Sequence, residues 1–344
     1  MKTRVYDLAR DREVAIAAAA EVIRSGGLVA FPTETVYGIG ADAMNDEAVR
    51  RIFAAKGRPA DNPLIVHIAH ADDADRLAFV TDNAYRAMQA FWPGPLTAVL
   101  KSRGKLPGSV SGGLDTVGIR LPGRDVAREL IESSDRFIAA PSANLSGKPS
   151  PTLAAHVIED FYGKVPIILD GGPTEVGVES TVCDFTGEIP VILRPGGITR
   201  EMIRDACGDV SVARAVLEGM ADNEKAASPG MKYKHYSPKA VVYVADGDSA
   251  SAIAKKVEAM YDKCIGAGKK TLILCMKDRA AAYGNRNTLI LGNSEADVAH
   301  SMFAALREAD LMKADVVLFE AVSNDGIGLA VMNRVLRAAA FKVI

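Results

Sequence analysis

Short apolar runs alternate with segments of helical period along most of the chain. In the first 206 residues the 3.6-residue period predicts helices at 13–24, 46–56, 83–91, 126–131, 153–161 and 200–206. Apolar runs of strand length lie between them, at 28–31, 64–68, 97–100, 116–121, 137–140, 167–169, 181–184 and 191–193. Because several later strands follow one another without an intervening helix, some must pair antiparallel. The pattern predicts a mixed α/β domain rather than a purely parallel, doubly wound sheet.

The carboxyl-terminal part has a simpler rhythm. Strands at 241–244, 271–275 and 316–320 alternate with helices at 250–261, 295–311 and 329–339, which predicts a small, Rossmann-like parallel α/β sheet. Between the two parts, residues 213–239 lack a strong apolar period, and the prolines and glycine within 228–238 rule out a continuous helix there. We therefore predict a catalytic domain over 1–212, a linker over 213–239 and a second domain over 240–344.

Composition narrows the class of protein. A chain of 344 residues exceeds what one hydrophobic core usually organises, and its net charge of -2 argues against a protein that mainly neutralises a nucleic-acid backbone. The four cysteines form no C-x-x-C pair, so neither a zinc site nor a disulfide framework is indicated. The charged first residues do not resemble a secretory signal, and no apolar run approaches the roughly 20 residues that cross a bilayer. We expect a cytoplasmic protein.

Polar loops follow two of the buried strands. The segment 139–152, AAPSANLSGKPSPT, places small hydroxyl and amide side chains where an apolar strand has ended, and such groups can bind phosphate or carboxylate oxygens. The segment 32–38, PTETVYG, offers further hydroxyls around one turn. It predicts either a ligand rim or a plain turn whose threonines bond to the backbone. A loose G-x-G-x-x-A pattern at 38–43 is discounted, because no acidic strand end follows at the distance a dinucleotide site requires.

Three cations and one histidine stand out. Lys56 and Arg58 end a helix beside glycine and prolines that fix the backbone, which favours a phosphate clamp, although the helix dipole alone also attracts cations there. Arg120 lies on an apolar strand and needs an anionic partner. That partner is either a ligand carboxylate or phosphate, or a protein carboxylate such as Glu34 or Glu179. His67 lies inside a strand, where a structural histidine is the commoner case.

Seven motifs in order carry a resemblance to a known family. They are PTETVYG, KGRPADNPLIVH, FWPGPLT, VGIRLP, APSANLSGKPSPT, ESTV and ILRPG, between residues 28 and 197. Together they resemble the YrdC/Sua5 family of threonylcarbamoyl-AMP synthases, and SPGMKYKHYSPKA and GIGLAVMNRVLRAA resemble the linker and second domain of its long Sua5 form. The resemblance implies a twisted mixed-sheet catalytic domain with a basic concave face.

The resemblance also implies an activity and a site. The family, a class of nucleotidyltransferase, makes threonylcarbamoyl-AMP and pyrophosphate from L-threonine, bicarbonate and ATP with Mg²⁺, and a tRNA threonylcarbamoyl transferase complex uses the product to modify adenosine 37. Four residues match the signature around the nucleotide phosphates, implying a catalytic role: Lys56, Arg58, Ser142 and Asn144. Five match threonine-binding positions: Thr35, His67, Arg120, Ala140 through its backbone, and Ser180. ATP positions are matched by Arg58, Asn62, Thr116, Ser142, Ser150, Arg194 and Tyr236. The linker, with Tyr236, is expected to act as a lid.

Two alternatives belong to other classes. A concave basic face could hold RNA, but the net charge and the lack of aromatic residues among the basic ones argue against an RNA-binding module, so direct tRNA contact is not predicted. A carbamoyl-transfer domain like that of hydrogenase maturation factors would carry acylphosphatase and zinc-finger segments, which this sequence lacks. No P-loop, H-E-x-x-H or G-x-S-x-G motif supports a nucleophilic or zinc-hydrolase mechanism.

Overall fold

The computed structural model describes residues 1–59, 62–218 and 236–344. The chain divides into two compact units, one formed by Met1–Ser146 and Ser150–Lys232 and the other by Gly147–Pro149 and Tyr233–Ile344. The second unit thus includes the short loop Gly147–Pro149, which the predicted division placed in the first domain, 1–212. Residues 219–235 of the predicted linker and lid, 213–239, lie outside the described residues. Among the described helices, none has the length and apolar composition that crossing a membrane requires.

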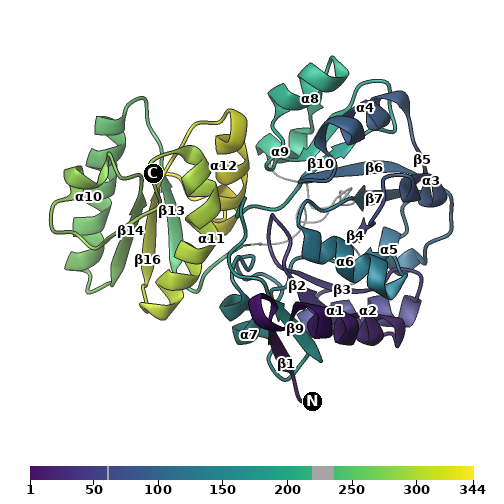
Figure 1. Ribbon diagram of the computed structural model, residues 1–344. Coiled ribbons are helices and arrows are strands. Elements are labelled where there is room, and N and C mark those ends of the chain that lie inside the picture. Colours follow the sequence, from purple (N-terminus) through teal and green to yellow (C-terminus); the bar gives the residue numbers. More distant parts are fainter. Residues whose placement is uncertain (60–61, 219–235) are drawn as a thin grey trace. The chain divides into compact units, whose positions relative to one another are not determined.

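The first unit is built on one large mixed sheet (Figure 1). Its strands lie in the order β1 (Arg4–Asp7), β9 (Ile167–Asp170), β2 (Val29–Phe31), β3 (Gly38–Asp42), β8 (Ile138–Ala139), β4 (Ile65–His67), β7 (Thr116–Arg120), β6 (Leu96–Ser102), β10 (Thr181–Asp184), β11 (Val191–Arg194) and β12 (Ser211–Val212), and β5 (Ala78–Phe79) pairs with β6. Strands β4 and β7 pair parallel, whereas β6 pairs antiparallel with β7, and β10 with β11. The prediction of a mixed sheet with antiparallel pairs is confirmed.

Helices cover the sheet on both faces. They are α1 (Leu8–Arg24), α2 (Asp46–Lys56), α3 (Asp73–Leu77), α4 (Asp82–Phe91), α5 (Gly108–Ser111), α6 (Asp125–Ser134), α7 (Ala154–Phe161), α8 (Arg200–Cys207) and α9 (Arg214–Glu218). Neighbouring residues of β2 belong to different cores, because Val29 and Phe31 pack with the α1 and α6 side chains and Ala30 packs with those of α2 and α7. With both faces buried, such strands appear in the sequence as continuous apolar runs.

Several elements of the first unit differ from the sequence prediction: β1, α3, β5, α5 and β12 were not predicted, and three further differences have a clear physical reason. Helix α1 begins at Leu8, five residues earlier than predicted, and the Asp7 side chain caps it by accepting the Ala9 N–H at 2.9 Å. Strand β3 was not predicted, because its glycines disfavour strands; a Cβ at Gly40 would lie 2.5 Å from Cγ2 of Ile138, so close packing requires glycine there. Helix α9 lies within the segment predicted as linker and buries Val216.

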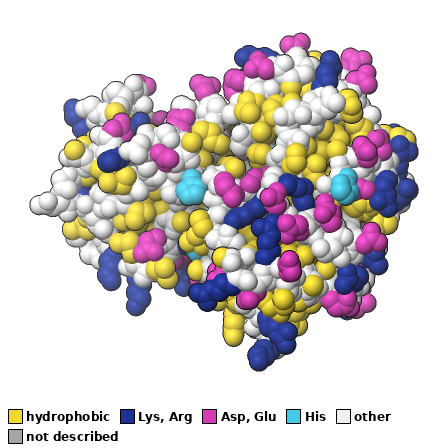
Figure 2. Space-filling model, viewed as in Figure 1, with side chains coloured by type: hydrophobic (Ala, Val, Ile, Leu, Met, Phe, Trp, Pro, Cys, Tyr) yellow, Lys and Arg dark blue, Asp and Glu magenta, His cyan; other side chains and the backbone are white. Residues whose placement is uncertain are grey.

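Basic and acidic side chains are interspersed on the face of the first unit that Figure 2 shows. In the first unit, Arg12 of α1 and Glu129 of α6 form one exposed ion pair, with Nη2 and Oε1 2.6 Å apart. A surface that binds along a nucleic-acid backbone instead has Lys and Arg side chains clustered on one face. The described side chains on this face therefore do not form such a surface.

The second unit contains a four-stranded parallel sheet in the order β13 (Val241–Ala245), β16 (Val316–Glu320), β14 (Thr271–Cys275) and β15 (Thr288–Ile290). Its helices are α10 (Ala250–Gly266), η1 (Ala280–Tyr283), α11 (Glu295–Leu311) and α12 (Gly326–Ala338). The predicted small parallel sheet is confirmed. The loop Gly147–Pro149 is held in this unit, because Arg307 Nη2 donates to the Pro149 carbonyl at 2.7 Å and the Ser237 N–H donates to the Gly147 carbonyl at 2.9 Å.

Candidate substrate-binding site

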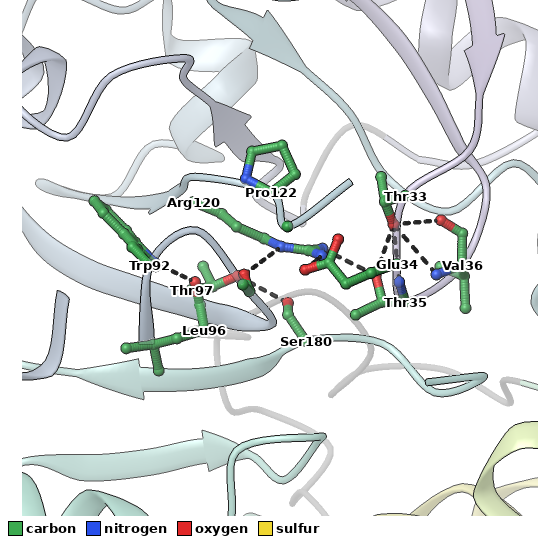
Figure 3. A network of polar contacts seen from close by, with 12 residues as sticks. Thr33, Glu34, Thr35, Val36, Trp92, Leu96, Thr97, Arg120, Pro122 and Ser180 are labelled. Atoms are coloured by element: carbon green, nitrogen blue, oxygen red, sulfur yellow. Dashed lines mark hydrogen bonds and ion pairs between the residues drawn. The ribbon is translucent and has the colours of Figure 1, made fainter. Parts of the chain in front are cut away.

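Arg120 is the centre of a buried polar cluster in the first unit. It ends β7, pairs in register with His67 of β4, and is 4% exposed. Its Nη1 donates to Thr35 Oγ1 at 3.0 Å (Figure 3). Its Nε donates to the Gly94 carbonyl at 3.3 Å. Its Nη2 lies 2.7 Å from Oε1 of Glu34. Of the partners considered from sequence, the protein carboxylate Glu34 is the one that contacts Arg120.

The Glu34–Arg120 pair is electrostatic but incompletely hydrogen-bonded. Burial alone would raise the pKa of Glu34, but the charge and proximity of Arg120 outweigh this effect, so the pKa lies below its ordinary value and the carboxyl is ionised at neutral pH. Among the described residues, neither oxygen of Glu34 nor Nη2 of Arg120 has a well-aligned hydrogen-bond partner. The two charges are therefore matched, and the backbone N–H groups of Gly123 and Glu34 also help to lower the pKa of this carboxyl.

The loop after β2 contains the plain turn considered from sequence, and its second threonine hydroxyl contacts Arg120. Thr33 Oγ1 donates to the Val36 carbonyl at 2.6 Å, as in a plain turn. Thr35 Oγ1 lies 2.8 Å from Thr33 Oγ1 and accepts from Arg120. Thr35 is fully buried, so its hydroxyl is held inside the cluster and not at the surface. One threonine stabilises the turn and the other belongs to the polar cluster.

Ser180, which immediately precedes β10, lies in a second polar cluster with Thr97 and Arg194. Its hydroxyl is 2.8 Å from Thr97 Oγ1 and accepts from Arg194 Nη2 at 3.1 Å. Arg194, at the end of β11, also donates through Nε to the Ser180 carbonyl at 3.1 Å. Thr97 was not among the site residues predicted from the sequence. The signal was present, because Thr97 is a hydroxyl residue inside the apolar strand β6.

Lys56 supports the loop that carries Ser142 and Asn144. Its Nζ, at the end of α2, donates to the Ser142 carbonyl at 2.5 Å and to the Asn144 carbonyl at 2.6 Å, and Lys56 is 4% exposed. Ser142 Oγ donates to Asn144 Oδ1 at 2.5 Å. The Ala143 N–H donates to the Tyr37 carbonyl at 2.7 Å, which joins this loop to the one after β2. Lys56 therefore has a structural role in addition to the predicted phosphate contact.

Arg58 and Asn62 lie together on the segment after α2. The Arg58 guanidinium is 5.8 Å from the Phe53 ring centroid, and its Nη2 donates to the Asn62 carbonyl at 3.3 Å. Asn62 itself is buried. The structure thus brings two of the predicted ATP-binding residues into direct contact.

The other predicted residues differ in their connections. Ser150 Oγ donates at 2.5 Å to Oε1 of Glu179, the residue that precedes Ser180. The Ala140 N–H donates to the Ile65 carbonyl at 3.0 Å. This hydrogen bond joins the residue after β8 to the first residue of β4. Thr116 begins β7, and no hydrogen bond described in the structure joins its side chain to these clusters. Tyr236 belongs to the second unit, where its ring centroid lies 5.3 Å from that of Phe303.

His67 is a neutral group next to the Arg120 cluster. Burial is the main cause that lowers its pKa, to about 3, and the charge of Arg120 lowers it further. Its Nδ1 has no hydrogen-bond partner among the described residues. The imidazole can therefore accept or donate a hydrogen bond to a ligand without carrying charge.

This pKa predicts a pH dependence of stability. Between pH 6.5 and about 3 the unfolded His67 binds a proton and the folded one does not, so the free energy of unfolding falls as pH falls through this range. The expected slope is on the order of 1 kcal/mol per pH unit. Urea unfolding of the wild type and His67→Gln at pH 7, 6 and 5 would measure it, and the variant should lose less stability. Equal losses in both proteins would contradict a buried neutral imidazole.

Comparisons with known proteins agree with this architecture. The Sua5/YciO/YrdC family model, described as telomere recombination, matches residues 21–196, and the model of the threonylcarbamoyl-AMP synthase C-terminal domain matches residues 198–340. The chain is 48% identical to a threonylcarbamoyl-AMP synthase of Pyrococcus abyssi over 97% of both chains, and 43% identical to one of Bacillus subtilis over the full length of both.

A solved structure extends the agreement to the fold. The crystal structure of P. abyssi Sua5 complexed with L-threonine matches with a TM-score of 0.94 and 47% identity, over 99% of both chains. Since a family model covers more than half of the chain and the relatives align over nearly all of it, this chain belongs to the Sua5/YciO/YrdC family, in the long form that carries the Sua5 carboxyl-terminal domain.

Proposed function

We propose that this chain is a threonylcarbamoyl-AMP synthase that forms threonylcarbamoyl-AMP and pyrophosphate from L-threonine, bicarbonate and ATP. The full-length relatives carry this name, and the related Sua5 structure holds L-threonine. The observation in this chain that supports the proposal best is the buried Arg120 cluster, with Thr35 and His67 beside it. A buried guanidinium with unfilled hydrogen-bonding capacity is suited to a small carboxylate ligand.

The amino-acid end of the reaction fits this cluster. Arg120 is proposed to bind the threonine carboxylate. The hydroxyls of Thr35 and Ser180, with the neutral imidazole of His67, would recognise its side-chain hydroxyl. Since threonine differs from serine by one methyl group, the discrimination available from binding is about 10- to 200-fold.

The nucleotide end would involve the cations and the loop after β8. Lys56, Arg58 and Arg194 are proposed to stabilise the ATP phosphates, with Ser142, Asn144, Asn62, Thr116, Ser150 and Tyr236 contacting the nucleotide. The amine of threonine and bicarbonate form a carbamate with loss of water, and a carbamate oxygen then attacks the α-phosphorus while pyrophosphate leaves. Catalysis would consist of orientation and stabilisation of charge, as in other nucleotidyl transfers. No protein nucleophile is needed.

Magnesium is proposed to enter with ATP, bound to its phosphates. Among the described residues, no group of three or more His, Cys, Asp or Glu side chains is placed to hold a metal ion. When bound, Mg²⁺ would neutralise charge on the phosphates. The residues of this chain would supply the remaining positive charge and the orientation.

The place of the reaction in the cell is also a proposal. The product would pass to a tRNA threonylcarbamoyl transferase complex, and the protein would act in the cytoplasm. A mixed adenylate hydrolyses readily in water, so direct transfer to the next enzyme would protect it.

The deciding experiment is pyrophosphate release from ATP and Mg²⁺, with L-threonine and bicarbonate each present or omitted. We expect release to require both, because the carbamate that attacks ATP contains atoms from each. Serine should support release more slowly. Release without threonine would indicate simple ATP hydrolysis, and no release together with salt-sensitive RNA binding in the absence of nucleotide would favour the RNA-binding alternative.

A further inference from the structure

The Arg120 cluster has a net charge of zero. Arg120 is positive, Glu34 is ionised beside it, and His67 is neutral. A free amino acid near neutral pH is also neutral overall, since it carries one carboxylate and one ammonium group. If Arg120 were the only charge, it would satisfy the carboxylate and leave the ammonium buried without an anion, which is costly. Glu34 supplies the missing negative charge.

Arg120 has contacts that hold it in place besides the one with Glu34. The guanidinium is already fixed at Nη1 by Thr35 and at Nε by the Gly94 carbonyl. Glu34 is itself fixed through its backbone, because its carbonyl accepts the N–H groups of Glu175 at 3.1 Å and Val176 at 2.8 Å. Both charged groups are thus positioned by other contacts, and their mutual contact is free to be shared with a ligand.

The geometry of the pair matches the two charges of an α-amino acid. In such a ligand the carboxylate and the ammonium are attached to the same carbon, so a complementary site needs opposite charges side by side. Arg120 Nη2 and Glu34 Oε1 are 2.7 Å apart. Both Glu34 oxygens and Arg120 Nη2 are buried without well-aligned partners among the described residues, although buried polar groups are normally satisfied. A Cβ at Gly123 would lie 3.2 Å from Glu34 Oε1, so Gly123 packs closely against this carboxylate.

We propose that Glu34 binds the α-ammonium group of the amino-acid substrate while Arg120 binds its carboxylate. The inference rests on the proposed function in one respect, namely that the substrate is an α-amino acid. Glu34 would then select ligands that carry an α-ammonium group at the binding step, before the reaction begins. A hydroxy acid of the same shape would meet the Glu34 carboxylate with no cation to offset it.

The test compares two ligands that differ only in the amino group, L-threonine and (R)-3-hydroxybutyrate, with the full chain and without ATP or bicarbonate. Titration calorimetry measures threonine affinity, and the rise in unfolding temperature at saturating ligand compares the two ligands. We expect Glu34→Gln to weaken threonine binding about 10- to 100-fold, because the ammonium group loses its anionic partner and keeps at most a hydrogen bond to a neutral amide oxygen. We expect 3-hydroxybutyrate to stabilise the variant at least as much as the wild type.

Two further variants keep the result interpretable. Glu34→Asp retains the charge on a shorter arm, should bind threonine with intermediate affinity, and decides the question alone if Glu34→Gln does not fold. Glu129→Gln makes the same chemical change in the Arg12–Glu129 ion pair on the α1 and α6 surface, and should bind both ligands as the wild type does. Wild-type ATP affinity in every variant would show that the fold is intact.

Two outcomes would overturn the proposal. Threonine affinity within threefold of the wild type in Glu34→Gln would show that the carboxylate does not bind substrate. A parallel loss for both ligands would show that Glu34 acts only by orienting Arg120. Neither result bears on pyrophosphate release by the wild type, so failure of this inference and failure of the proposed function remain distinguishable.

Discussion

Arg120→Ala is expected to lower L-threonine affinity by at least roughly 100-fold while ATP affinity stays within threefold. Arg120 is proposed as the partner of the threonine carboxylate, and its described contacts are with Glu34, Thr35 and Gly94, none of which is a predicted ATP-binding residue. Titration calorimetry with each ligand separately would measure both effects. Equal losses of threonine and ATP affinity would contradict the assignment of Arg120 to the amino acid.

The same variant is expected to be less stable, by about 3–5 kcal/mol, because it leaves the Glu34 carboxylate buried without its counter-charge. Burial then raises the pKa of Glu34 above its unfolded value, so the free energy of unfolding should fall as pH rises through that pKa. The double variant Arg120→Ala with Glu34→Gln removes both charges. It should recover part of the stability and none of the threonine affinity, which separates the structural effect from the binding effect.

Lys56→Met is expected to reduce the maximal rate of pyrophosphate release about 100- to 1000-fold. The Lys56 ammonium donates to the carbonyls of Ser142 and Asn144, so its loss removes two buried hydrogen bonds from the loop proposed to contact the phosphates. It also removes a positive charge from that region. Threonine affinity should change little, because Arg120 and its partners are untouched.

The control for Lys56 is Lys105→Met, which removes an exposed lysine from a loop of the first unit. Its rate should equal that of the wild type. Steady-state pyrophosphate release and thermal unfolding of the three proteins would give the answer. A Lys56→Met enzyme with more than half of the wild-type rate would mean that neither the charge nor the support of the Ser142 loop matters for the reaction.

Much of the fold was predictable because it depends on local patterns. Helix α2 was predicted with its observed bounds, since Asn45 caps its start through Ala48 N–H and Gly57 ends it at a φ of 62°. Strand β14 was also predicted with its observed bounds, as a continuous apolar run buried on both faces. Strand β3 was missed, because its glycines are explained only by the close approach of Ile138.

The sequence by itself determined the fold class, the order of most elements and the residues expected to contact substrates. It established that Arg120 needs an anion, because a buried guanidinium on an apolar strand must have one. Only the tertiary structure decided that this anion is Glu34, that Thr97 joins Ser180, and that Lys56 holds the loop of Ser142 and Asn144. These pairs are distant in sequence and depend on sheet register and loop packing, which local patterns of hydrophobicity and charge do not encode.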